Sequence, residues 1–328
     1  MGKGTSSVEN LVSKHTRKAL ITGAAGFIGS HLCALLEERD WHVTALDLPQ
    51  ANWWRHTELS INPIRVEINL ADSFSLEQLC KNNYYDCVFH LSAMTDVSRD
   101  VMLLDVLIKE NIIATNNLLG ILKDHARRII ITGTCEEYGN GNVPFSEKQR
   151  EIAVSPYSWS KICVTHLSEL YMRIFNAPVM VVRPFLTYGP LQTNEMLIPA
   201  VIRAALKNES VPMTKGEQTR DFNYVTDIVE GMMLMADVPN FKDPIMNLGS
   251  GVETSILHVV ELIYQLCESS SQPEIGVLPY RAGETMNFYC DNQQARINLG
   301  WTPKISLNEG LLLTIDWYRD YLRRQDQQ

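Results

Sequence analysis

The sequence predicts an α/β fold: a doubly wound parallel sheet with a smaller C-terminal α/β lobe. Two observations carry this prediction. Short apolar runs alternate with helical patterns through the first half of the chain, which is the order that strand-helix-strand units require. A glycine-rich turn, residues 23–29, stands directly between the first apolar run and the first helical pattern. At 328 residues, the chain is long enough for one full domain and a smaller lobe.

Composition limits the kind of protein this can be. The net charge is −9 and no basic stretch stands out, so we expect no nucleic-acid partner and no binding to anionic membranes. The seven cysteines are scattered without a Cys-x-x-Cys pair, which favours reduced thiols, and the eight histidines form no metal-spaced cluster. No apolar run has transmembrane length, and no signal-peptide core opens the chain. We therefore expect a cytoplasmic protein without a metal site.

The glycine-rich turn follows the first predicted strand, Lys18–Thr22, and precedes a helical pattern. Glycines in this context allow a tight turn and the close approach of a pyrophosphate, which the helix N-terminus then binds. Three glycines alone could form only a turn, but the strand and helix around them favour a dinucleotide site. The expected cofactor contacts are Gly23, Gly26, Phe27, Ile28 and Gly29.

The second strand, Val43–Leu46, ends at Asp47, which lies 18 residues after Gly29. A carboxylate at this position accepts hydrogen bonds from the adenine ribose and repels a 2′-phosphate. NAD is therefore favoured over NADP. Arg55 is close enough in the sequence to keep NADP open, and Asp47 could also simply begin a turn before Pro49.

Further apolar runs predict the rest of the parallel sheet. They are Ile64–Ile68, Cys87–Leu91, Arg128–Ile131 and Val179–Val182. Asp72 or Ser73 is expected to cap the helix after the first of these strands. We interpret His90, inside the second, as a structural residue.

Two helices predict a contact between subunits. The helix expected at residues 101–123 has apolar residues on more than one face, whereas a surface helix needs only one apolar stripe. We expect its second face, together with the helix at residues 157–176, to pack against a second protomer in a homodimer. The alternative is that the C-terminal lobe covers it.

Beyond Pro184, loops lengthen and elements shorten. Helical patterns at residues 197–206, 227–236, 256–267 and 307–321 and an extended segment at residues 221–225 are assigned to the smaller lobe.

The spacing of Tyr157 and Lys161 predicts an active site. If Pro156 opens a helix, the two side chains lie one turn apart on the same face. Lowering a tyrosine pKa from ~10 to about 7 requires roughly 4 kcal/mol, which the ammonium and a cationic nicotinamide ring could supply. Thr134, just past the strand at residues 128–131, could hold the substrate oxygen that Tyr157 deprotonates. Without an upstream dinucleotide site, the same pair would fit a packed ring beside a solvated lysine.

The directions of the side chains in residues 134–137 determine which of them can act on the substrate. If it is extended, Thr134 and Glu136 point one way while Cys135 and Glu137 point the other.

From about Lys18 onward the chain resembles the extended short-chain dehydrogenases/reductases that act on nucleotide sugars, the NAD-dependent epimerase/dehydratase family. The matching segments are residues 22–29, 89–93, Asn111, Tyr138-Gly139, residues 156–161, 188–190, 220–227, 247–251 and 299–301. The resemblance implies that Thr134, Tyr157 and Lys161 are catalytic. It also implies cofactor contacts at Asn69, Leu70, Leu91, Ser92 and Ala93.

The resemblance further implies a nucleoside-diphosphate sugar as substrate. Arg220 and Arg281 look like clamps on its diphosphate, and Leu197 lies in a segment similar to a substrate-binding one. Glu136 occupies the position of a base that removes the proton at C5. Cys135 stands where 4,6-dehydratases carry the acid that protonates the departing 6-hydroxyl.

These observations lead to an NAD-dependent nucleotide-sugar dehydratase or epimerase that oxidises C4, with possible C5 proton abstraction by Glu136. An NAD(P)H-dependent 4-keto-6-deoxysugar reductase stays open, as does a non-catalytic dinucleotide-binding protein. We expect a disordered tail at residues 1–17 and a Rossmann domain with the catalytic residues at 18–183. Residues 184–328 are expected to form mainly the nucleotide-sugar lobe, with some return to the Rossmann core.

Overall fold

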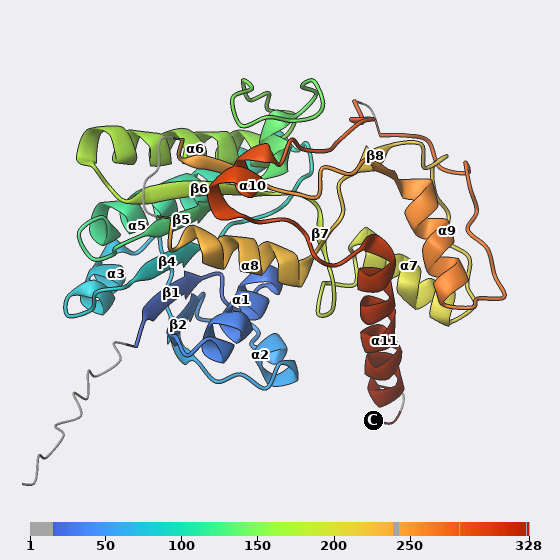
Figure 1. The fold of residues 1–328 in the computed structure, drawn as a ribbon, viewed down its shortest axis with the longest axis horizontal. Helices are drawn as coiled ribbons and strands as arrows, with labels where there is room; N and C mark the ends of the chain where they lie inside the picture. Colours follow the sequence, from blue (N-terminus) through green and yellow to red (C-terminus); the bar gives the residue numbers. More distant parts are fainter. Residues whose placement is uncertain (1–15, 239–242, 282, 326, 328) are drawn as a thin grey trace, which may run out of the picture.

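The computed structural model describes residues 16–238, 243–281, 283–325 and 327. Its centre is a seven-stranded sheet in the order β10-β6-β5-β4-β1-β2-β3, with every pair parallel (Figure 1). The strands are β1 (Lys18–Thr22), β2 (His42–Asp47), β3 (Ile64–Glu67), β4 (Cys87–His90), β5 (Ile129–Thr132), β6 (Val179–Pro184) and β10 (Ile245–Leu248). The predicted doubly wound fold is confirmed. β10 is a strand that the sequence patterns missed.

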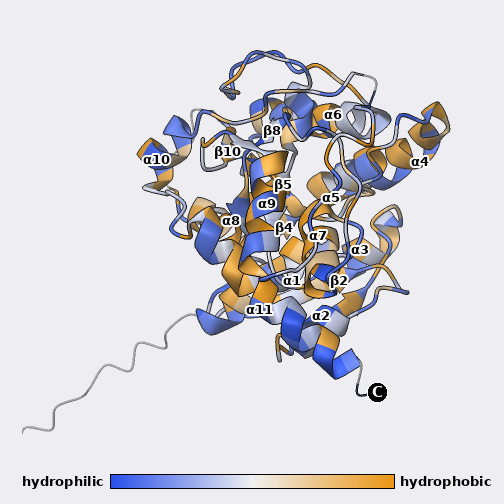
Figure 2. Ribbon diagram, turned by 90° about the vertical axis from the view of Figure 1, so that its right-hand side faces the viewer, coloured by the Kyte–Doolittle hydropathy of each residue, from blue (hydrophilic) through white to orange (hydrophobic). Residues whose placement is uncertain are grey.

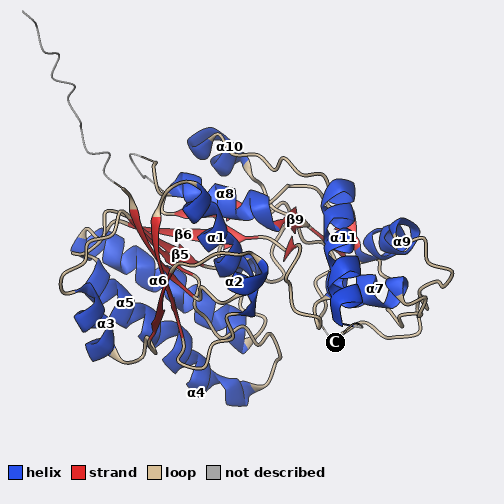
Figure 3. Ribbon diagram, turned by 90° about the horizontal axis from the view of Figure 1, so that it is seen from below, coloured by secondary structure: helices blue, strands red, loops and turns tan. Residues whose placement is uncertain are grey.

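Helices cover both faces of this sheet. α1 (Phe27–Glu38) and α8 (Val225–Met235) share one apolar core with β1, β2 and β4. On the other face, α3 (Ser73–Cys80), α5 (Ala114–Leu122) and α6 (Pro156–Phe175) close a second core. Figure 3 shows α1 and α8 on one side of the strands and α3 and α5 on the other. Asp72 caps α3, as predicted, by accepting from the backbone of Phe74 and Ser75.

The position of α8 corrects one prediction. We assigned residues 227–236 to the smaller lobe, but Ile228 and Met232 are fully buried against the α1 residue Leu32 and its neighbours. An amphipathic pattern identifies the face that a helix buries but not the partner that buries it. The chain therefore returns to the sheet through α8 and β10.

The smaller lobe has its own apolar core beyond the end of the sheet. Its helices are α7 (Leu197–Leu206), α9 (Ile256–Leu266) and α11 (Leu307–Gln325), which Figure 1 shows away from the sheet. Two pairs of short strands also belong to this half of the chain. β7 (Thr187–Tyr188) pairs with β9 (Asn223–Tyr224), and β8 (Thr219–Arg220) pairs with β11 (Thr254–Ser255). Two short helices complete the fold: α2 (Trp54–Glu58) and α10 (Gln293–Leu299).

The helix expected at residues 101–123 exists but changes its winding. A 3₁₀ turn (Val101–Leu103) leads into α4 (Leu104–Leu107), a π-helical turn (Ile108–Ile113) and α5. Asn111, inside the π turn, is buried and donates to Ser160 Oγ on α6. Met102 is 79% exposed, and Figure 2 shows α4 at the edge of the molecule. The alternative that the C-terminal lobe covers this surface is therefore wrong.

The start of the chain was predicted to be a tail. Residues 1–15 lie outside the described residues, whereas Arg17 forms an ion pair with Asp237 beyond the end of α8. The prediction of disorder is therefore wrong for Arg17. Within the described ranges, no helix has both the length and the apolar character needed to cross a membrane.

Candidate active site

The glycine turn is packed too tightly for side chains. Gly23 has a φ of +69°, and a Cβ there would lie 2.7 Å from the backbone nitrogen of Ser92. A Cβ on Gly29 would lie 2.2 Å from the carbonyl oxygen of Gly23. No side chain caps α1 at Gly26, so the N–H groups of its first turn are available to an anion. This geometry fits the pyrophosphate of a dinucleotide.

Asp47 and Arg55 have different surroundings at the end of β2. Asp47 accepts 2.9 Å hydrogen bonds from the backbone nitrogens of Ala25 and Leu48, which fix its carboxylate beside the glycine turn. Arg55 is buried and donates to the carbonyl oxygens of Ala25 (3.0 Å) and Leu191 (2.9 Å). Because its guanidinium is bonded to the backbone, Arg55 is poorly placed to read a 2′-phosphate. The site therefore fits NAD better than NADP.

The remaining expected cofactor residues lie where β3 and β4 end. Leu70 is buried, and Asn69 accepts from the backbone of Ala71 at 2.8 Å. Leu91 and Ser92 both donate from their backbone nitrogens to Thr22, at the end of β1. Since parallel strands end at one edge, these residues and Ala93, which follows them, share the edge that carries the glycine turn.

His90 has the structural role that we predicted. It is buried, with hydrogen bonds to the hydroxyls of Thr22 (2.7 Å) and Thr115 (2.9 Å). Burial lowers its pKa to about 3, so the ring is neutral. His90 thus ties two strand ends to the helix that carries Asn111.

Tyr157 and Lys161 lie in the first turns of α6, which begins at Pro156 with Ser155 as its N-cap. Burial raises the pKa of Tyr157 above its ordinary value, while a hydrogen bond to Thr134 acts in the opposite direction. In the chain without the nicotinamide ring, burial outweighs the groups that lower the Tyr157 pKa, so the expected fall of this pKa stays a prediction for the NAD complex. Lys161 donates to the carbonyl oxygen of Thr132, and burial lowers its pKa to about 8 although Glu137 acts to raise it.

Residues 135–138 form a 3₁₀ turn rather than an extended segment, so the expected alternation is wrong. The cause is local hydrogen bonding. Thr134 Oγ1 accepts from the backbone of Glu136 at 3.3 Å, and Glu137 Oε1 accepts from the backbone of Thr134 at 2.8 Å. The turn separates the two glutamates: Glu137 enters the core and Glu136 stays partly exposed.

Cys135 and Glu136 both have raised pKa values because of burial. The thiol pKa of Cys135 lies well above its usual range, so the thiol is neutral. The carboxyl pKa of Glu136 is raised mainly by burial, while the positive charges of Arg220, Arg281 and Arg99 lower it. The Glu136 carboxylate is therefore a stronger base than the carboxylate of an exposed glutamate.

The two predicted diphosphate clamps have different surroundings. Arg220 forms an ion pair with Glu284 and donates to the carbonyl oxygen of Thr285 at 2.9 Å. Arg281 is exposed, and Leu197 is 37% exposed at the start of α7. The charges of both arginines act on Glu136, but Arg220 already has an acidic partner.

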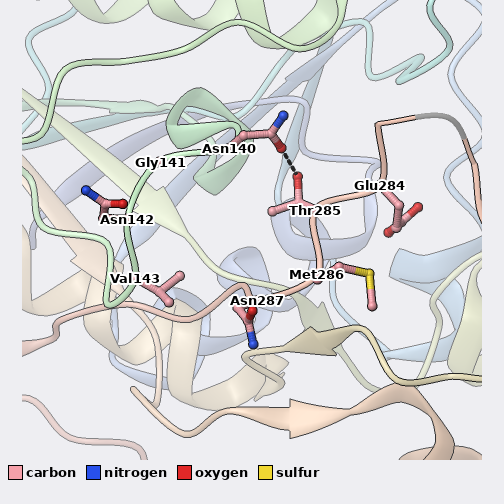
Figure 4. A pocket seen from close by; sticks show the side chains of 8 residues that line it. All are labelled: Asn140, Gly141, Asn142, Val143, Glu284, Thr285, Met286 and Asn287. Carbon is pink, nitrogen blue, oxygen red and sulfur yellow. Dashed lines mark hydrogen bonds between the residues drawn. The ribbon is translucent and has the colours of Figure 1, made fainter.

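A pocket of about 460 Å³ separates residues 140–143 from residues 284–287 (Figure 4). Thr285 Oγ1 donates to Asn140 Oδ1 at 2.6 Å across one end of it. This bond joins the segment after the 3₁₀ turn at residues 135–138 to the segment after Arg281.

The sequence patterns did not identify the roles of Glu284 and Asn140 or the ion pair of Glu137 with Arg183. The position of Arg183 in the sequence could have indicated its ion pair. An arginine at the end of an apolar strand needs an acidic partner if the strand is buried.

The glycine turn, Asp47 and the convergence of Thr134 with Tyr157 define the class: an NAD-binding enzyme of the short-chain dehydrogenase/reductase type. Within this class, the chain belongs to the NAD dependent epimerase/dehydratase family, whose sequence profile matches residues 19–249. The predicted family and the NAD cofactor are thereby confirmed.

The chain is similar to three proteins that are named for nucleotide sugars or bound to them. The chain is 35% identical to a UDP-N-acetyl-alpha-D-glucosaminuronate decarboxylase of Bacillus cytotoxicus, over 93% of this chain and 98% of that protein. It is similar to the crystal structure of a UDP-glucose 4-epimerase with UDP-glucose from Thermotoga maritima, with a TM-score of 0.86, 28% identity and coverage of 93% and 99%. It is also similar to MoeE5 in complex with UDP-glucuronic acid and NAD, with a TM-score of 0.82, 30% identity and the same coverage.

Proposed function

We propose that this protein oxidises a nucleoside-diphosphate sugar at C4 with NAD. It then dehydrates the oxidised sugar or changes its stereochemistry, and returns the hydride from the same NAD. The observation that carries the proposal is the grouping of Thr134, Glu136 and Tyr157 at the carboxyl edge of the sheet. A hydrogen-bonding group for the C4 hydroxyl, a base for its proton and a carboxylate that can act as a second base then lie together. The proposed class is a dehydratase or epimerase.

Each residue has a separate task in this proposal. NAD, when bound, supplies the hydride acceptor for C4. The Thr134 hydroxyl orients the C4 oxygen, and Tyr157 takes its proton. Lys161, protonated below its pKa of about 8, favours the tyrosinate by its charge. Glu136 then removes the C5 proton, which the new C4 ketone has made acidic.

The acidity of the Cys135 thiol affects which reaction can follow the oxidation at C4. Loss of the 6-hydroxyl as water requires a proton donor, and a buried thiol with a raised pKa is a weak one. A uronic acid oxidised at C4 is a β-keto acid, which loses carbon dioxide without an acid at C6. Similarity to the Bacillus cytotoxicus decarboxylase favours this second candidate, decarboxylation of a sugar carboxylate.

Nothing in the comparisons favours the 4-ketoreductase alternative. A simple reductase would also have no use for Glu136 as a base at C5. A non-catalytic dinucleotide-binding protein would have no need for Thr134 and Tyr157 in contact.

The sugar nucleotide is proposed to lie between the two lobes. Arg220 and Arg281 would bind its diphosphate, with Arg220 exchanging Glu284 for the ligand, and Leu197 would contact it from α7. This arrangement supplies the local positive charge that a chain with a net charge of −9 otherwise lacks.

Homodimer formation through residues 101–123 and α6 is part of the proposal. Exposed apolar side chains in these two regions support it, namely Met102, Val106, Ile113, Leu170 and Ile174. All seven cysteines are free thiols, which supports a cytoplasmic location.

The deciding experiment uses purified protein without added cofactor. The protein is denatured to identify the released dinucleotide, and native protein is incubated with UDP-glucose, dTDP-glucose, UDP-glucuronic acid and UDP-N-acetylglucosaminuronic acid. Loss of water, loss of carbon dioxide and unchanged mass with altered stereochemistry identify a dehydratase, a decarboxylase and an epimerase, respectively. Activity that begins only when NADH or NADPH and a 4-keto sugar are added would overturn the proposal.

Two variants assign the roles. Tyr157→Phe is expected to lower kcat by about 10²- to 10⁴-fold with NAD content unchanged, because it removes the proton acceptor. Glu136→Gln is expected to block dehydration by a similar factor but to spare decarboxylation, which needs no base at C5. Retained dehydration in Glu136→Gln would contradict its assignment as the base.

A further inference from the structure

The carboxylate of Glu137 is fully buried, yet it points away from the space where the substrate is proposed to lie. Its Oε2 accepts from Thr165 Oγ1 at 2.8 Å and from Arg183 Nε and Nη2 at 2.9 and 2.6 Å. Its Oε1 accepts from the backbone nitrogen of Thr134 at 2.8 Å. One carboxylate therefore joins α6 and β6 to the residue that precedes the catalytic 3₁₀ turn.

We propose that Glu137 is a positioning residue, whose carboxylate, anchored by Arg183, holds the backbone of Thr134 so that the Thr134 hydroxyl faces Tyr157. This inference rests on the proposed function of Thr134 and Tyr157. Glu137 does not touch substrate or cofactor. Its effect passes through the Thr134 backbone.

Arg183, which anchors the Glu137 carboxylate, is buried and has several partners. The Arg183 side chain is fully buried, and its Nη2 also donates to Glu151 Oε1 at 2.8 Å. Its guanidinium lies 4.7 Å from the ring centre of Tyr138, the last residue of the 3₁₀ turn. Arg183 thus contacts the last two residues of this turn directly and reaches Thr134 through the Glu137 carboxylate.

Gly133 shows how closely the carboxylate approaches the backbone. A Cβ on Gly133 would lie 2.5 Å from Glu137 Oε1 and 3.2 Å from Arg183 Cγ. Only glycine lets the carboxylate fold back onto the segment that it holds. The glycine before Thr134 is therefore explained by Glu137 rather than by a turn.

An amide cannot replace this carboxylate. Glutamine offers one acceptor oxygen and one donor group, whereas Arg183 and the Thr134 N–H both require an acceptor. The buried guanidinium would keep the oxygen, so the glutamine NH₂ group would face the Thr134 N–H and their hydrogen bond would be lost. Glu137→Gln should therefore release Thr134 while leaving the core shape unchanged.

The experiment compares Glu137→Gln and Glu137→Asp with the control Glu151→Gln. Aspartate keeps the charge for Arg183 but is one methylene shorter, so it cannot span both Arg183 and Thr134. The control removes the other partner of Arg183 without touching Thr134. We expect both Glu137 variants to lose about tenfold or more in kcat, since small displacements of reacting groups have effects of this size. KM and bound NAD are expected to stay within about twofold, and the control is expected to keep its kcat within about twofold.

Hydrogen exchange of the peptide covering residues 129–138 supplies a readout that does not depend on turnover. Exchange is expected to be faster in the Glu137 variants than in Glu151→Gln. A folded Glu137→Asp protein with wild-type kcat and wild-type exchange would overturn the inference, as would a control that loses as much kcat as Glu137→Gln. If the wild-type protein converts no nucleotide sugar, the proposed function fails, and the exchange comparison alone still supports or rejects the Glu137–Thr134 contact.

Discussion

Two arginine–glutamate pairs lie at the turn that carries Cys135 and Glu136 and beside it, and they differ in exposure. Arg183 and Glu137 are both 0% exposed, whereas Arg220 and Glu284 are 20% and 17% exposed where the lobes meet. A fully buried pair cannot change partners without leaving a charge in the core, but a partly exposed pair can exchange its partner for water or a ligand. The inner pair can therefore fix the segment, while the outer pair can respond to a substrate.

Breaking the inner pair should have the largest effect. Arg183→Met leaves the Glu137 carboxylate buried with only neutral donors, so we expect the free energy of unfolding to fall by about 3–5 kcal/mol. The matched change at the outer pair, Arg220→Met, is expected to cost about 1 kcal/mol or less. Urea titration of both variants measures the difference. Equal losses would show that the two pairs are not distinct.

The charge of the inner pair should also be visible in the pH dependence of activity. Lys161 faces Glu137, His90 and Tyr157, and burial lowers its pKa to about 8. The ammonium is present below this pH and is lost as the pH rises through it, so we expect kcat to fall above about pH 8.

Variants at the two pairs test whether the inner pair sets the pH at which kcat declines. Glu137 acts to raise the Lys161 pKa, so Glu137→Gln should move the alkaline decline to lower pH. Glu284→Gln, at the outer pair, should leave the decline where it is. A profile that moves equally in both variants would mean that Lys161 does not sense the inner pair selectively.

The smallest expected effect lies at the outer pair. Glu284→Gln removes a carboxylate that competes with a diphosphate for Arg220, so we expect UDP to bind about fivefold more tightly, equivalent to about 1 kcal/mol. Asp316→Asn, which removes the partner of Arg319 on α11, is the control for a simple change in net charge. Calorimetric titration measures both. Weaker binding in Glu284→Gln would show that Glu284 assists the ligand instead of competing with it.

The sequence was most informative where backbone geometry sets the site. The glycine turn, the end of β2 at Asp47 and the start of α6 at Pro156 all follow from local patterns with a period or a cap. These features need few contacts from distant residues. They were therefore predictable from short stretches of the chain.

Side-chain partners from distant residues were not predictable in this way. Glu284 pairs with Arg220 across 64 positions, and Glu137 pairs with Arg183 across 46. The 3₁₀ turn at Glu136 and Glu137 depends on the Thr134 cap, which competes with the extended conformation that we expected. β10 was missed because Asn247 interrupts its apolar run.

The edge strand β10 has a consequence for synthesis of the protein. β1 to β6 are complete at Pro184, but β6 gains its outer neighbour only when residues 245–248 arrive. Trp301 then fastens α8 through a 2.9 Å hydrogen bond to the carbonyl oxygen of Asp227. A nascent chain that ends between these points carries an open strand edge of the kind that recruits other chains. Ribosome stalling in this interval is therefore expected to yield aggregation-prone fragments that depend on chaperones.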